Sequence, residues 1–147
     1  MQKLKALINE LTGMFEELNG VEDKKKEAIL KDRPTEVEDC MKQEQVLTLR
    51  FKSCEKKVEE MLKQAGEEDK TLKDLLDQLS PEEREELLPL YERLQSSVLS
   101  YRELNNTVAD LLKVRLHSVE KKIEQAGIYT SSGGHKTSDS DGRVRRV

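Results

Sequence analysis

Apolar residues recur along the chain at alternating steps of three and four, the spacing that places them on one side of an α-helix. Three such runs predict helices over residues 1–31, about 36–65 and 80–126. The first two runs have similar lengths and are joined by a short break at residues 31–34, so we expect them to form an antiparallel hairpin. The third run is clearly longer.

Each hairpin helix carries a heptad stripe with one charged residue in it, Lys25 in the first helix and Glu44 in the second. Both lie at comparable distances from the break, so they should face each other. Two interpretations stay open: two solvated charges at a loose seam, or a buried pair that fixes the register. The stripes are Leu4, Leu7, Leu11, Met14, Leu18, Val21, Lys25 and Ala28, with Ile8, Phe15 and Ile29 beside them, and Val37, Cys40, Glu44, Leu47, Phe51, Cys54, Val58, Met61 and Ala65.

Turn and capping residues predict where the second helix begins and ends. Pro34 disfavours helix at the residue before it, and Thr35 can then cap the second helix, with Glu38 completing a capping box. Gly66 is a natural C-terminal stop. The charged run at residues 22–27 is most simply a solvated helix face.

A leucine-rich connector at residues 67–79 predicts a short amphipathic helix before the third long one. Ser80 can cap the third helix, with Pro81 at its first position and Glu83 completing a capping box. Pro89 should kink this helix or force a local restart, because its ring clashes with the carbonyl four residues earlier. The connector leucines are Leu72, Leu75, Leu76 and Leu79.

The stripe of the third helix takes two consecutive steps of four at Leu112, a stutter that re-aims it relative to a coiled-coil partner. A third helix of roughly 69 Å also outruns hairpin helices of roughly 45 Å, so its partners should end near Leu112. We therefore expect a core segment before this point and a binding segment after it. The stripe reads Leu87, Tyr91, Leu94, Val98, Tyr101, Asn105, Val108 and Leu112, then Leu116, Val119, Ile123 and Ala126.

The part of this stripe without an obvious cover is the candidate partner-binding site, for a partner helix or for self-association. The alternative is that the connector helix folds onto the bundle and shifts the register. The candidate binding residues are Leu112, Leu116, Val119 and Ile123, with Leu104, Asn105 and Val108 at the inner end.

Composition agrees with long helices, since 38% of residues are charged, 35% are hydrophobic and only 3% are aromatic. A net charge of −4 disfavours a nucleic-acid partner. No apolar run approaches the ~20 residues that a membrane span needs, and no signal peptide is apparent. Cys40 and Cys54 lie roughly 21 Å apart on one helix, too far for a disulfide, so we expect buried thiols in a reducing, cytoplasmic chain.

Catalytic, metal and cofactor chemistry is not expected. His117 and His135 have no His or Cys at metal-ligand spacing, and the Gly-rich segment at residues 132–134 follows no strand. We therefore predict an all-α protein with three long helices, a connector helix and no enzymatic activity. Residues 1–127 should form the helical domain, and residues 128–147 a disordered polar tail that folding does not need.

Two segments carry a resemblance to a known family. One is Tyr101-Arg-Glu-Leu-Asn-Asn-Thr-Val-Ala-Asp-Leu-Leu112, and the other is Ile128-Tyr129-Thr-Ser-Ser-Gly133. The first is similar to the Asn-containing segment followed by Leu-Leu in the last helix of the FlgN family, and the second to that family's Tyr-x-x-x-Gly terminus. The resemblance covers roughly residues 1–133. The adjacent pair Asn105-Asn106 and the proline at position 89 depart from the family pattern.

This resemblance implies a cytoplasmic flagellar export chaperone. Such a protein binds the C-terminal segment of the hook–filament junction subunits, FlgK or FlgL, mainly through its own C-terminal helix, and holds them for type III secretion. Components of the export apparatus are further partners that the resemblance allows. The alternatives are a self-associating structural coiled coil, a homo-oligomer among them, and another helical type III chaperone or regulator.

Overall fold

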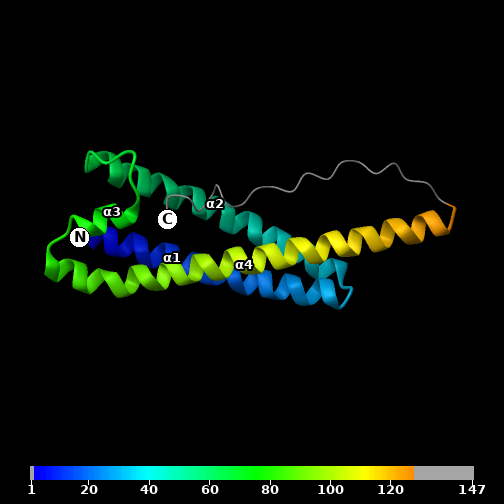
Figure 1. Cartoon of the computed structure of the whole chain (residues 1–147). Coiled ribbons are helices and arrows are strands. Elements are labelled where there is room, and N and C mark those ends of the chain that lie inside the picture. Colours follow the sequence, from blue (N-terminus) through cyan, green and yellow to red (C-terminus); the bar gives the residue numbers. More distant parts are fainter. Residues whose placement is uncertain (1, 128–147) are drawn as a thin grey trace.

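The computed structural model describes residues 2–127, which form three long helices and a short one (Figure 1). This architecture confirms the all-α fold class expected from the sequence. The predicted tail, residues 128–147, lies outside the described residues. The elements are α1 (Gln2–Leu30), α2 (Pro34–Gln64), α3 (Leu72–Asp77) and α4 (Pro81–Gln125).

The central helix is α1, which packs against both α2 and α4. α2 runs antiparallel to α1, and α4 runs parallel to it, so consecutive long helices alternate in direction (Figure 1). Ion pairs on the surface connect α1 to each of these two neighbours, in residue order that agrees with the antiparallel and parallel directions. They are Glu10–Lys57 and Glu17–Arg50 between α1 and α2, and Lys5–Glu86 and Glu16–Arg93 between α1 and α4.

The whole predicted stripe of α1 is buried, including Ile8 and Phe15 beside it. This buried face is wide because α1 meets a helix on each of two sides. The Phe15 ring lies 5.7 Å from that of Phe51 on α2 and 5.8 Å from that of Tyr101 on α4, measured between ring centroids. One aromatic side chain thus joins all three long helices.

The predicted stripe of α2 is wrong at its C-terminal end. Leu62 is buried, whereas Met61 is only half-buried and Ala65 is exposed. A straight α-helix has 3.6 residues per turn, so a strict seven-residue repeat drifts away from the core over several turns. A step of four from Val58 to Leu62 corrects that drift.

The expected capping box at Thr35 is also wrong, because α2 begins two residues earlier than expected, at Pro34, with Arg33 at the cap position. In the turn after α1, Asp32 adopts the left-handed conformation at a φ of 55°, and the Arg33 N–H donates to the Ala28 carbonyl at 2.9 Å. This is the hydrogen-bond pattern of a Schellman turn. The turn delivers Pro34 directly to the first helical position, where its fixed φ fits and its missing N–H costs nothing.

The other predicted boundaries are confirmed. Gly66 ends α2 with a φ of 71°, which suits a residue without a side chain. The capping box that Thr71 and Asp74 form at the start of α3 was not predicted. Ser80 caps α4 by accepting a hydrogen bond from the Glu83 N–H at 3.3 Å, and its hydroxyl donates to the Glu83 carboxylate at 3.0 Å.

α4 continues through Pro89 as one helix, so the local restart that the sequence allowed does not occur. Proline has no N–H to donate to the Glu85 carbonyl. Both residues are exposed, so water can hydrate that carbonyl. The position of Pro89 on the outer side of the bundle therefore limits the damage to α4.

Candidate functional site: the projecting end of α4

The polar contacts between α4 and the hairpin reach as far as Arg115 in the described part of the chain. Its guanidinium donates to the Leu30 carbonyl at 3.2 Å and lies 3.4 Å from the Asp32 carboxylate. α4 then continues for residues 116–125, about 15 Å, beyond the end of α1. Figure 1 shows this yellow-to-orange end projecting past the hairpin. We call residues 112–125 the arm, and the corner between the arm and the hairpin turn the step.

The predicted binding residues divide into two groups at Leu112. The residues before it are covered by the bundle to different degrees, and those from Leu112 onward are largely open. Exposed fractions are 39% at Leu112, 42% at Leu116 and 51% at Val119, with Ile123 half-buried; Leu104 and Asn105 are half-buried, and Val108 is 2% exposed.

The apolar stripe of the arm faces the same side as the buried part of α4. At about 100° per residue, positions 108, 112, 116, 119 and 123 fall within roughly 80° of arc. Because Val108 faces the bundle interior, the open residues lie where the surface of α1 would continue if α1 were longer. The stutter at Leu112 thus offsets the drift of a 3.5-residue repeat. The sequence had suggested that the two parts of the stripe point in different directions, and this is wrong, because both face the same side.

Leu30 lies at the step and was not among the binding residues predicted from the sequence. It is 53% exposed, and its carbonyl accepts the hydrogen bond from Arg115. Leu30 falls outside the heptad stripe of α1, which ends at Ala28 and Ile29. The one available signal was its position as the last residue before the predicted break at residues 31–34.

The alternative cover for the arm, the connector helix, lies elsewhere. α3 packs on α2 and α4 through buried Leu72 and Leu76. It lies at the end of the bundle where α4 begins, opposite the arm (Figure 1). The connector therefore folds onto the bundle, as that alternative required, but leaves the stripe open.

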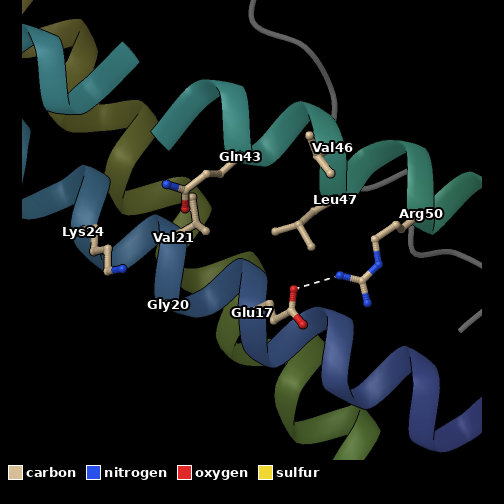
Figure 2. A pocket seen from close by; sticks show the side chains of 8 residues that line it. All are labelled: Glu17, Gly20, Val21, Lys24, Gln43, Val46, Leu47 and Arg50. Carbon is tan, nitrogen blue, oxygen red and sulfur yellow. Dashed lines mark hydrogen bonds and ion pairs between the residues drawn. The ribbon is translucent and has the colours of Figure 1, made fainter. Parts of the chain in front are cut away.

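A second opening lies between α1 and α2, a groove of about 380 Å³ (Figure 2). Its apolar floor is formed by Val21 and Leu47, and an Arg50–Glu17 ion pair of 2.9 Å spans one end. A Cβ atom at Gly20 would meet nothing within 4 Å, so packing there leaves room for alanine. The hydrophobic pattern did not predict this groove. The lining residues are Glu17, Gly20, Val21, Lys24, Gln43, Val46, Leu47 and Arg50.

A buried charged cluster joins α1 and α2 near the hairpin turn. The Lys25 Nζ lies 3.0 Å from the Glu44 Oε1, so the predicted pair exists; Lys25 is 8% exposed and Glu44 is half-buried. Glu22, which the sequence suggested was solvated, is only 1% exposed. Its burial, followed by a hydrogen bond to Glu44 and the charge of Glu44, raises the Glu22 pKa to about 8. Glu22 is therefore largely protonated at pH 7 and can donate to the Glu44 carboxylate.

Both cysteines are buried free thiols, as expected. Burial, with the charge of Glu10 as a further cause, raises the pKa of Cys54 to about 11. Burial also raises the pKa of Cys40 above its usual value. Because the thiolate is the reactive form, both side chains are suited to packing and not to chemistry.

One of three comparisons with known proteins gives a match. Residues 1–134 match a family model described as FlgN protein, and the match covers all the helices described above. No curated protein and no solved structure matches the chain. Among the described helices, none combines the length and the apolar character that crossing a bilayer would need.

Proposed function

The chain belongs to the FlgN family of flagellar export chaperones, and from that premise we propose that it binds the C-terminal segment of a hook–filament junction protein of the FlgK or FlgL type. In this proposal it acts in the cytoplasm and keeps the segment soluble until secretion. The family is one of chaperones and not of enzymes.

The open stripe of the arm is the observation that supports this proposal. An amphipathic segment lays its apolar face against complementary apolar side chains, and no catalytic group is needed. Leu112, Leu116, Val119 and Ile123 present about three turns of such a surface. Leu30 at the step adds an apolar residue from a second element.

The size of the stripe suggests a reversible complex. Full burial of one Leu or Ile contributes roughly 1.5–3 kcal/mol, and part of the total offsets the lost freedom of the two partners. We expect a dissociation constant on the order of 1 μM for an isolated client segment. Such a complex can release its client when export begins.

Sedimentation velocity tests the proposal against self-association, which the same open stripe also favours as a second candidate. The full chain is run alone and with the client peptide, a synthetic peptide that has the C-terminal sequence of a junction protein. A chaperone forms a heavier species only when the client peptide is present. A chain that self-associates to the same extent with and without the peptide is a structural coiled-coil protein, and the chaperone proposal is then wrong.

A further inference from the structure

The arm differs in charge from the rest of the helical domain. Residues 1–111 carry 18 Lys and Arg against 26 Asp and Glu, a net charge of −8. The arm carries four basic residues against two acidic ones, a net charge of +2. An acidic bundle thus ends in a basic, amphipathic helix.

The basic residues of the arm lie beside its apolar stripe. On a helical projection, Arg115 and Lys122 border one edge of the stripe, and Lys113 and Glu120 border the other. Three of the four flanking residues are therefore basic. Arg115 already contacts Asp32, which leaves Lys113 and Lys122 as the cations directed toward a partner on the stripe.

The shape of the step determines what kind of partner can reach the stripe. The stripe faces the side that α1 occupies, so a flat surface such as a membrane would meet the hairpin turn at residues 31–33 first. A helix, about 10 Å wide, fits in line with α1 where α1 ends. A second copy of the arm has the right shape but carries the same basic flanks, so it is a poorer match in charge.

We propose that the occupant of the step is an amphipathic helix of about three turns whose apolar face is bordered by Asp and Glu. This inference rests on the proposed function, because it specifies the chemistry of the client segment. The apolar stripe supplies most of the contact area. The flanking cations select acidic partners and speed their encounter.

Two synthetic peptides of equal length test the inference. Both peptides have blocked termini and Leu along one face of the helix that they would form. One peptide has Glu and the other has Lys at the four positions that border this face. In calorimetric titrations of the full chain at low salt, we expect the Glu-flanked peptide to bind about tenfold more tightly. Raising the salt from about 0.05 M to 0.5 M should reduce that preference, since exposed charges are screened.

Variants of the arm test whether Lys113 and Lys122 cause the preference for the Glu-flanked peptide. Lys113→Glu/Lys122→Glu should remove or reverse the preference, with melts followed by circular dichroism confirming an intact fold. Lys121→Glu is the matched control, because Lys121 is on the face opposite the stripe and is also a lysine of the arm. The control should keep the wild-type preference.

Several outcomes would overturn the inference. These are equal binding of the two peptides, tighter binding of the Lys-flanked peptide, and a loss of preference in Lys121→Glu as large as in the double variant. Equal binding that still requires Leu116 and Ile123 leaves the proposed function standing. If the client peptide fails to bind as well, the proposed function fails with the inference.

Discussion

The two parts of α4 have the same pattern and opposite surroundings. Before Leu112 the stripe is buried or half-buried, with Leu87 and Leu94 fully covered, whereas Leu116 and Val119 in the arm are about half exposed. Both parts face the same side of one continuous helix. The difference lies in α1, which ends at Leu30. An apolar stripe therefore determines which face of a helix needs a partner, and the length of the neighbouring helix determines whether the chain itself supplies it.

Matched substitutions on α4 test this comparison most strongly. Leu94→Ala should destabilise the domain by about 2–5 kcal/mol, because it leaves a cavity in the packed core. Leu116→Ala should change the free energy of unfolding by no more than about 0.5 kcal/mol, as expected for an exposed site. Urea unfolding of both variants measures the difference. Equal destabilisation would mean that the arm is packed in solution.

The second prediction concerns the buried pair in the hairpin. Lys25→Glu and Glu44→Lys should each cost about 2 kcal/mol or more, since each leaves like charges at a buried site. Lys25→Glu should be the worse of the two, because it places three carboxyl groups together with Glu22 and Glu44. The double swap should recover part of the loss in a double-mutant cycle. A double variant no better than the sum of the singles would contradict the pairing.

The third prediction is that Glu22 makes the free energy of unfolding depend on pH. Its pKa is about 8 in the folded protein and near 4.5 in the unfolded chain, so the folded state holds more protons between these values. Stability should therefore fall as the pH rises from about 5 to 8. Glu22→Gln should flatten this fall and exceed the wild type at pH 8 by more than about 1 kcal/mol, near the equivalent of one pKa unit.

Urea unfolding at pH 5, 6.5 and 8 measures the effect. Glu27→Gln is the control, because Glu27 is exposed and its pKa is lowered by Lys31. The control should keep the wild-type pH profile. Parallel profiles for Glu22→Gln and the wild type would show that Glu22 is ionised at neutral pH in the folded protein.

Hydrophobic periodicity was sufficient to predict most of the fold. It identified the entire buried stripe of α1, because a central helix must be apolar wherever it meets its neighbours. It failed at exposed Ala65 and missed buried Leu62, where an ideal heptad departs from real helix geometry. The start of α2 depended on the left-handed backbone of Asp32, which residue type alone does not reveal. Glu22 was missed because a charged residue in a charged run normally lies in solvent.

The sequence predicted which face of α4 carries the candidate site better than it predicted where along α4 that face becomes exposed. The sequence located the stripe from Leu112 to Ile123, and in the structure Leu112, Leu116 and Val119 are exposed and Ile123 is half-buried. It also grouped Val108 with those residues, although Val108 is buried. The position at which α1 stops covering the stripe of α4 depends on the register between the two helices. The contacts of Arg115 with Leu30 and Asp32 show this register. That register follows from three-dimensional packing between segments about 80 residues apart.

The central claim, that the arm receives the client, is tested most directly by titrating the client peptide into Leu116→Ser/Ile123→Ser. Losing two apolar contacts should weaken binding by about tenfold or more, with little change in the thermal midpoint. Leu99→Ser/Val114→Ser is the matched control, because both residues are exposed on α4 away from the stripe, and it should bind at full strength. Full-strength binding by the Leu116/Ile123 variant, or its unfolding, would contradict the claim.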